Sequence, residues 1–251
     1  MTDPVLFTQG LCKSFGALRV TNNLDLRIEA GARHALIGPN GAGKSTLVNL
    51  LTGVLKPSSG KVWLNGEDIT GLPAAERVWK GLSRTFQVST IFPRLTAFEA
   101  VVLAVCRRER LLRNPSRLLS GCKPQAEEAW DFLGRFGLTG VADRQMGELA
   151  YGQQRLTEIV LALAARPKVL LLDEPAAGVP AQDSEALFSA IENLPRDVAV
   201  LFIEHDMELV FRFAEKITVL VAGESFREGV PAEIASDPDV RRVYLGDEDD
   251  E

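Results

Sequence analysis

The stretch from His34 to Thr46 constrains the fold of this chain more than any other part of the sequence. It begins with the apolar run 35–37, continues through a turn with three glycines, and ends in Lys-Ser-Thr before the apolar run 47–51. This order fits the G-x-x-x-x-G-K-[ST] pattern of a phosphate-binding loop placed between a strand and a helix. The pattern therefore predicts a nucleotide site where a buried strand meets a helix.

The residues of this loop have different parts in holding phosphate. Glycines allow a tight turn whose N–H groups point inward, and a helix beginning near Lys44 adds the positive end of its dipole. We expect Lys44 to reach the β- and γ-phosphates and Ser45 to bind Mg²⁺. The residues expected to bind the nucleotide are Gly38, Pro39, Asn40, Gly41, Ala42, Gly43, Lys44, Ser45 and Thr46. A glycine-rich turn without a ligand is the weaker interpretation.

Composition narrows the class of protein. With 46% hydrophobic residues in 251, the chain can bury a large core. No apolar run approaches the length of a membrane span, and residues 1–4 lack the features of a signal peptide, so we expect a cytoplasmic protein. Cys12, Cys106 and Cys122 have no metal-binding spacing and are expected to be packing residues.

The charge pattern gives no indication of nucleic-acid binding. The net charge is −6, and the acidic residues at 247–251 predict a solvated tail. The basic stretch 107–123 is interpreted as a solvated helix end and loop, with contact to anionic lipid headgroups as the alternative.

Apolar patterning predicts two kinds of sheet. The segments 5–8, 24–28 and 61–64, the last followed by Asn-Gly, indicate an antiparallel sheet. The fully apolar runs 168–173 and 198–203, separated by a helical pattern over 183–193, indicate buried parallel strands. Helical patterns at 95–106, 125–136 and 152–165 predict a helical subdomain inserted into this α/β core.

Two adjacent carboxylates follow the first of these apolar runs. In parallel sheets, ligands bind beyond the carboxyl ends of the strands, and Asp173 and Glu174 would point in different directions there. Given the phosphate loop, we expect Asp173 to hold Mg²⁺ and Glu174 to polarise the attacking water. His205 follows the next apolar run and is expected to contact the γ-phosphate. An Asp-Glu pair alone would as often be a cap, and a lone histidine is more often structural.

The segment Leu149-Ala150-Tyr151-Gly152-Gln153-Gln154-Arg155 resembles the signature of ATP-binding cassette (ABC) ATPases, whose usual form is Leu-Ser-Gly-Gly-Gln. Together with the phosphate loop, the Asp-Glu strand end and His205, the resemblance covers nearly the whole chain. It implies an α/β fold with a P-loop NTPase (RecA-like) core, an antiparallel β subdomain and an inserted helical subdomain. The implied division of residues 1–251 is a core with the β subdomain at 1–87 and 167–251, and a helical subdomain at 88–166 that ends in the signature helix.

The resemblance also implies roles that the residues alone would not assign. Gln87 would sense the γ-phosphate, contact Mg²⁺ and take part in catalysis with Glu174, His205 and Lys44. Phe15 would stack on adenine. The remaining nucleotide contacts, made across a head-to-tail dimer to the partner's ATP, would come from Tyr151, Gly152 and Gln153.

The partners implied are a second cassette, identical or paralogous, and two membrane-embedded permeases. A solute-binding protein would act indirectly, and no nucleic acid is involved. The protein would sit peripherally on the cytoplasmic face of the inner or plasma membrane and use ATP and Mg²⁺. Two residues depart from the family pattern: Ala150 replaces the signature serine, and Pro180 stands where many cassettes have an aspartate that couples the two sites.

Three segments look like those of the ATPases of the branched-chain amino acid uptake group: the signature at 149–155, residues 173–178 and residues 243–246. Relatives in that group also serve urea, amides and organic acids. The alternatives are the cassette of a lipid or lipopolysaccharide exporter and a soluble non-transport cassette. A GTPase-like switch is disfavoured because the sequence has no Asn-Lys-x-Asp motif.

Overall fold

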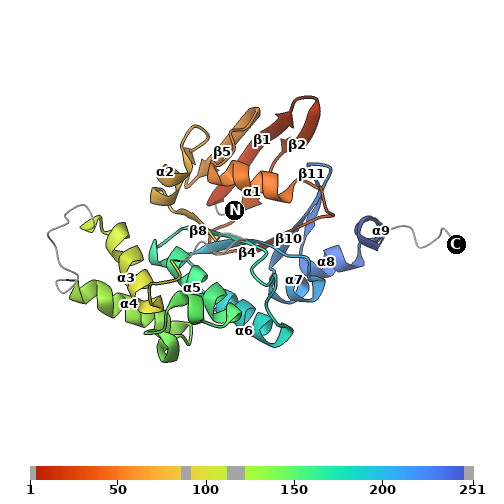
Figure 1. Ribbon diagram of the computed structural model, residues 1–251. Coiled ribbons are helices and arrows are strands. Elements are labelled where there is room, and N and C mark those ends of the chain that lie inside the picture. Colours follow the sequence, from red (N-terminus) through yellow and green to blue (C-terminus); the bar gives the residue numbers. More distant parts are fainter. Residues whose placement is uncertain (1–3, 86–91, 112–121, 246–251) are drawn as a thin grey trace.

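A six-stranded sheet lies at the centre of the fold (Figure 1). The computed structural model describes residues 4–85, 92–111 and 122–245. The strand order in this sheet is β11-β10-β4-β9-β8-β7, and β11 alone runs antiparallel to its neighbour. The strands are β4 (Arg33–Ile37), β7 (Leu82–Arg84), β8 (Val169–Asp173), β9 (Ala199–Ile203), β10 (Lys216–Val221) and β11 (Glu224–Gly229). The two apolar runs are therefore buried parallel strands, as expected.

The parallel arrangement brings three distant segments to one edge of the sheet. Every residue of β4, β8 and β9 is buried, and Ile203 of β9 is opposite Leu36 of β4 and Asp173 of β8. Since carboxyl ends of parallel strands share an edge, the loops that follow these three strands leave the sheet side by side. This edge carries the candidate site.

A second, antiparallel sheet covers one face of the central sheet (Figure 1). Its strands are β1 (Leu6–Phe15), β2 (Leu18–Leu24), β3 (Arg27–Ile28), β5 (Ser59–Leu64) and β6 (Glu67–Asp68). Helix α1 (Lys44–Thr52) packs between the two sheets, where its Leu47 and Leu51 share a core with Leu6 and Leu201. The antiparallel sheet thus stabilises the helix that the phosphate-binding loop begins.

The prediction of a continuous strand over 24–28 was wrong. The chain leaves β2 at Leu24 and enters β3 only at Arg27. At the break, the buried Thr8 hydroxyl donates to Leu24 O (2.8 Å) and accepts from Leu26 N (2.9 Å). A side chain from β1 therefore satisfies the backbone groups that a strand ladder would otherwise pair.

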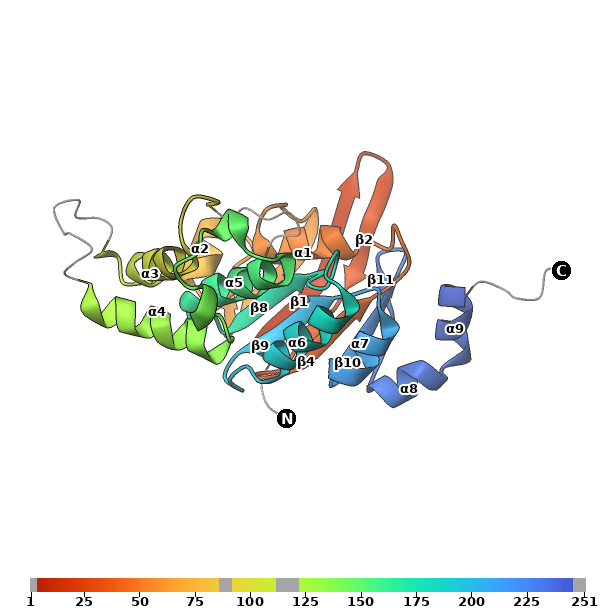
Figure 2. The same cartoon turned by 60° about the horizontal axis from the view of Figure 1, so that its bottom comes forward.

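Helices cover the other face of the central sheet (Figure 2). They are α5 (Tyr151–Ala164), α6 (Ala181–Glu192), α7 (Met207–Phe213) and α8 (Pro231–Ser236). The ring centroid of Phe188 in α6 lies 5.6 Å from that of Phe202 in β9 and 5.2 Å from that of Phe213 in α7. These aromatic contacts fix α6 and α7 against the middle of the sheet.

Helices α3 (Ala97–Arg108), α4 (Lys123–Arg135) and α5 share a separate apolar core at one end of the molecule (Figures 1 and 2). It includes Val101, Leu133 and Val160, together with Cys106 and Cys122. The expected helices are confirmed with ends that differ by a few residues, and these two cysteines are packing residues. Elsewhere in the described residues, the chain forms α2 (Ala74–Trp79), α9 (Pro238–Leu245) and the 3-10 turns Thr139–Val141 and Met146–Glu148.

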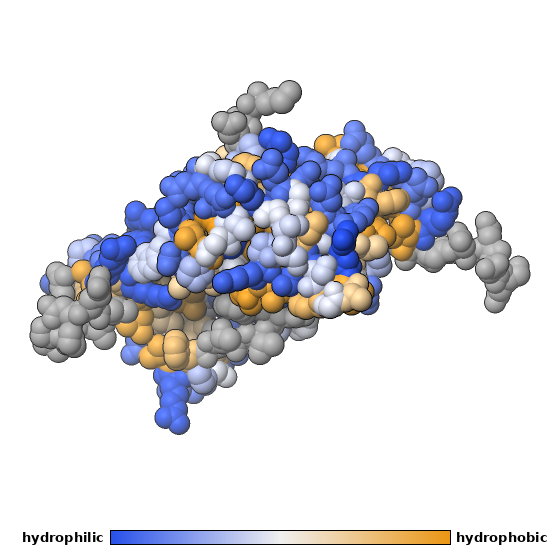
Figure 3. All heavy atoms as spheres, turned by 90° about the horizontal axis from the view of Figure 1, so that it is seen from above, coloured by the Kyte–Doolittle hydropathy of each residue, from blue (hydrophilic) through white to orange (hydrophobic). Residues whose placement is uncertain are grey.

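The surface seen from the side of the antiparallel sheet is largely hydrophilic, with apolar side chains in small separate groups (Figure 3). Within the described ranges, no helix has both the length and the apolar character needed to cross a bilayer.

Candidate active site

The phosphate-binding loop joins β4 to α1 in a shape that requires glycine. Gly43 lies in the left-handed region (φ 101°) directly before α1, and a Cβ there would be 2.7 Å from Val20 O. A Cβ on Gly38 would be 2.2 Å from Leu220 O. Real Cβ atoms do not approach backbone oxygens so closely, so the loop can pack against β2 and β10 only without these side chains. The loop thus leads directly into the N-terminus of α1, and helix N-termini favour anions.

Lys44 is buried, and its ammonium lies within the loop. Its Nζ donates to Gly38 O (2.6 Å) and Pro39 O (3.1 Å). Burial lowers the pKa of Lys44, while the negative charges of Glu174 and Asp173 oppose that shift. The loop thus holds a positive charge near two carboxylates, where a phosphate could be bound. Ser45 follows at an exposed position of the first turn.

Asp173 ends β8 with a buried carboxylate that is already paired. Arg84 of β7 contacts Asp173 Oδ2 through Nη2 at 2.7 Å, and its Nη1 donates to Asn49 Oδ1 of α1 at 2.7 Å. The Arg84 guanidinium thus links β7 to β8 and to α1, the helix that follows the phosphate loop. Arg84 and Asn49 were not identified from the sequence, although Arg84 pairs in register with Leu171 on the neighbouring strand.

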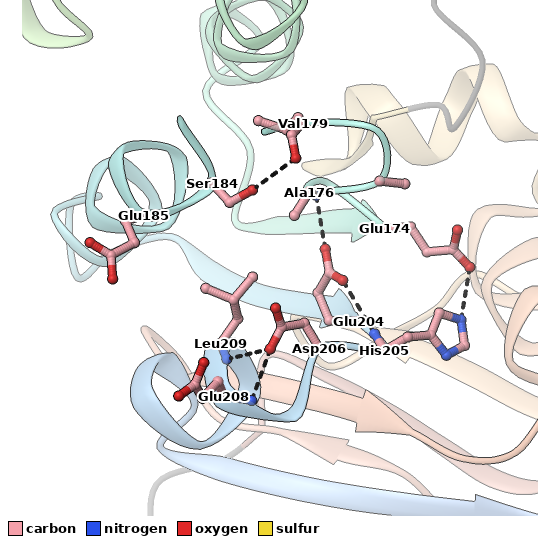
Figure 4. Close-up of a pocket in the computed structure, with 11 residues that line it drawn as sticks. Glu174, Ala176, Val179, Ser184, Glu185, Glu204, His205, Asp206, Glu208 and Leu209 are labelled. Atoms are coloured by element: carbon pink, nitrogen blue, oxygen red, sulfur yellow. Dashed lines mark hydrogen bonds and ion pairs between the residues drawn. The ribbon is translucent and has the colours of Figure 1, made fainter. Parts of the chain in front are cut away.

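Glu174 and His205 face each other across the edge of the sheet (Figure 4). Glu174 Oε1 lies 3.0 Å from His205 Nε2, and both side chains are partly exposed. Glu174 has a left-handed backbone (φ 49°), and its N–H donates to Ile203 O at 3.0 Å. The adjacent carboxylates of Asp173 and Glu174 therefore point to different partners, as the sequence predicted. A partly exposed carboxylate next to an imidazole is suited to orienting a water molecule.

Glu204 lies between these two segments and was not identified from the sequence. Its buried carboxylate accepts from Ala176 N (2.8 Å) and His205 N (3.2 Å). Burial raises the pKa of Glu204, with a further increase from the charge of Glu174, against the effect of the two N–H donors. A hollow of about 540 Å³ opens beside it, lined also by Asp206 and Glu208 at the start of α7.

The signature segment places Tyr151 at the first turn of α5. The Tyr151 hydroxyl donates to Ala177 O (3.1 Å) and accepts from Arg155 Nη2 (2.7 Å). The Gln153 side chain accepts from Ala150 N at 3.2 Å, but Ala150 has no hydroxyl to cap the helix in return. The amino end of α5, with Gly152 and Gln153, is thus held next to the loop that follows Glu174.

Four further expectations concern Phe15, Pro180, Gln87 and the acidic tail. Phe15 ends β1 as a half-exposed ring with Lys13 Nζ 5.1 Å from its centroid, in the hairpin whose other strand passes the phosphate loop at Val20. Pro180 directly precedes α6 and provides no side-chain cap. Gln87 and the acidic tail at 247–251 lie outside the described residues.

Comparisons with known proteins match the chain over most of its length. Residues 21–177 match the family model described as ABC transporter, and residues 228–250 match the model described as branched-chain amino acid ATP-binding cassette transporter. The chain is 39% identical to the high-affinity branched-chain amino acid transport ATP-binding protein BraF of Pseudomonas aeruginosa, over 98% of this chain and all of that protein. It is 37% identical to the corresponding protein LivG of Escherichia coli K12, with the same coverage.

Solved structures give the same result. MJ1267, an ATP-binding cassette of an ABC transporter, superposes in its ADP conformation with a TM-score of 0.85 at 30% identity, over 98% of this chain and all of that one. The cassette MJ0796, seen as a dimer bound to ADP and phosphate after hydrolysis, superposes with a TM-score of 0.74 at 25% identity, over 90% of this chain and 98% of that one.

Proposed function

The chain belongs to the ABC transporter family as one of its ATP-binding cassettes, and on that premise we propose that it energises the uptake of branched-chain amino acids or a related small polar or organic-acid solute. Cassettes of this family hydrolyse ATP, dimerise and pair with permeases. The observation that supports the proposed site most directly is the meeting of Lys44, Asp173, Glu174 and His205 at one edge of the sheet. The solute class is supported by the match of the C-terminal segment at 228–250.

We propose the following division of labour at the site. The phosphate loop binds the triphosphate through its N–H groups, and Lys44 balances its charge. Glu174 orients and polarises the water that attacks the γ-phosphorus, and His205 holds the γ-phosphate next to Glu174. Gln87 is proposed as the γ-phosphate sensor on the basis of the family pattern, and Phe15 as the ring that stacks on adenine. In a head-to-tail dimer, the amino end of α5 would face the partner's ATP.

The residues present fit a magnesium ion. Ser45 offers a hydroxyl and Asp173 a carboxylate, oxygen ligands of the kind that Mg²⁺ takes together with phosphates and waters. Bound there with ATP, Mg²⁺ would neutralise charge that develops on the phosphates. Since Asp173 is paired with Arg84 in this structure, Arg84 would have to share this carboxylate with the ion.

An apolar hollow on the helical end supports the proposed permease contact. It has a volume of about 450 Å³, is lined by Phe92 to Leu95 and by Leu103 of α3, and includes the 72% exposed side chain of Phe92. A hollow of this kind could accept one apolar turn of a permease helix, and docking there would hold the protein at the cytoplasmic face of the membrane.

Copurification from native membranes tests this function. The tagged chain is extracted in mild detergent, and its partners are identified by mass spectrometry. Two polytopic permeases, a second cassette and a solute-binding protein that carries an amino acid would support the proposal. Recovery of lipid-export components alone, or of ribosomes or DNA-repair proteins, would refute it.

A further inference from the structure

We infer that Glu204 is a positioning residue for ATP hydrolysis, because its carboxylate ties the loop after Glu174 to the backbone of His205. The inference rests on the function proposed above, in which Glu174 and His205 act together on the γ-phosphate. It adds a residue that does not itself touch the reacting atoms.

The geometry of Glu204 places it between the two segments (Figure 4). It directly follows β9, is 5% exposed, and points toward the loop that follows β8. One oxygen accepts from Ala176 N and the other from His205 N. A carboxylate only accepts hydrogen bonds, so it satisfies two N–H donors at once, and such charge-assisted bonds are stronger than neutral ones.

The two hydrogen bonds act on both halves of the Glu174–His205 pair. Ala176 lies two residues after Glu174, whose backbone is in the left-handed region that a non-glycine residue rarely adopts. Ile203 O holds the N–H of Glu174, and Glu204 holds the chain just beyond it. The same carboxylate fixes the backbone from which the His205 ring reaches Glu174. Glu204 therefore sets the relative position of the two side chains.

The electrostatics at this position point to the same role. Burial raises the pKa of Glu204, and the nearby charge of Glu174 raises it further. A buried carboxylate next to another carboxylate is costly, and an apolar side chain of the same length would avoid that cost. The two N–H bonds are the interactions on this face that an apolar side chain could not replace.

Two substitutions and a matched control test the inference in the full-length protein. Glu204→Met keeps the length of the side chain but removes both acceptors, whereas Glu204→Gln keeps one. Glu208→Gln makes the same charge change on an exposed residue of α7 in the same hollow, whose carboxylate contacts neither Ala176 nor His205. For each protein we would measure the kcat and KM of ATP hydrolysis, the Kd for a fluorescent ATP analogue and the midpoint of thermal unfolding.

The expected result is a separation of kcat from binding. Since small misplacements of catalytic groups cost up to about 100-fold, kcat should fall at least about tenfold in Glu204→Met and less in Glu204→Gln. The Kd for the ATP analogue should change less than twofold, and Glu208→Gln should match the original protein. The chain has two histidines, and His34 is buried, so the ring signals of His205 can be followed separately by NMR. They should shift in Glu204→Met and stay in place in Glu208→Gln.

Unchanged kcat in Glu204→Met, or a loss explained wholly by a lower unfolding midpoint, would overturn the inference. If Glu204→Met does not fold, Glu204→Gln decides by the same measurements of kcat and ring signals. The proposed function has its own test in Glu174→Gln. Full hydrolysis by Glu174→Gln would refute the proposed site. Loss of hydrolysis in Glu174→Gln together with unchanged hydrolysis in the Glu204 variants would refute only the role of Glu204.

Discussion

At the scale of single residues, Asp173 and Glu174 show how neighbouring carboxylates are given different chemistry. Asp173 is buried and paired with Arg84, while Glu174 is partly exposed and contacts His205. Asp173 ends β8 with its carboxylate on Arg84 of β7, whereas the left-handed backbone of Glu174 turns the next carboxylate toward His205, which follows β9. The same substitution at the two positions should therefore have different effects.

Glu174→Gln should leave ATP binding intact and nearly abolish hydrolysis. The amide keeps the size of the side chain but cannot take a proton from water, and loss of a general base costs roughly 100-fold or more. Steady-state phosphate release and binding of a fluorescent ATP analogue measure the two effects separately. The control is Glu185→Gln, an exposed carboxylate paired with Arg212. Hydrolysis above about a tenth of the original rate would contradict the role of Glu174.

Arg84→Ala should destabilise the nucleotide-free protein by about 3 kcal/mol, because it leaves the buried Asp173 carboxylate without its ion pair. Arg84→Lys should recover only part of this loss, since an ammonium cannot reproduce the planar fork that reaches Asn49 and Asp173 together. Urea unfolding followed by circular dichroism gives the free energy. If Arg84→Ala unfolds at the same urea concentration as the original protein, this bridge makes no contribution.

These residues also mark how far the sequence could predict the site. Lys44, Asp173, Glu174 and His205 were found because each follows a recognisable strand or loop pattern at one edge. Arg84 and Glu204 were missed, since their contacts depend on strand register and on two backbone N–H groups, which no local pattern reveals.

At the scale of elements, helix α5 begins without one of its usual caps. Gln153 accepts from Ala150 N, which is half of a capping box, and the missing half would be a hydroxyl at position 150 that accepts from Gln153 N. A serine at position 150, as in the family pattern, would therefore also cap helix α5, and Ala150 lacks this stabilising contact.

Ala150→Ser should therefore stabilise the protein by about 1 kcal/mol, the usual value of such a cap. Thermal unfolding would detect it as a higher midpoint. Ala232→Ser, an exposed change inside α8, is the control and should give no gain. An unchanged or lower midpoint in Ala150→Ser would show that the helix start is already satisfied by other groups.

The elements themselves were largely predictable. The buried strands and the helices follow from apolar runs and helical spacing, and the fold class is confirmed by the solved cassettes. The break between β2 and β3 was not predictable, because it depends on the Thr8 hydroxyl of another strand. Tertiary contacts decided the boundary there, against the local alternation.

At the scale of the whole molecule, stability should depend on pH through His34. Burial lowers the pKa of His34 to about 4 from its ordinary value of 6.5. The unfolded chain then binds a proton there between these two pH values while the folded chain does not, so the free energy of unfolding falls as the pH is lowered through this window. The charge of Glu228, linked through Thr218, opposes this shift, and Lys216 adds to it.

His34→Gln should remove this part of the pH dependence. The difference in unfolding free energy between the two proteins should change by about 1.4 kcal/mol per pH unit between pH 6.5 and 4 and stay constant above that window. Comparing the two proteins cancels the opposite contribution of Glu204, whose raised pKa makes stability fall as the pH rises. Parallel pH profiles for the two proteins would contradict the assignment.

The order of strands in the central sheet has a consequence for biosynthesis. β9 separates β4 from β8 in space, yet it follows both in the chain. When β4 and β8 have left the ribosome, the phosphate loop, Asp173 and Glu174 have been synthesised. Strand β9, which lies between β4 and β8 in the sheet, has not. The edges of β4 and β8 that pair with β9 therefore stay unpaired in the nascent chain until about residue 203 emerges. Pauses in translation before that point should increase aggregation or recruitment of chaperones, whereas pauses after it should do so less.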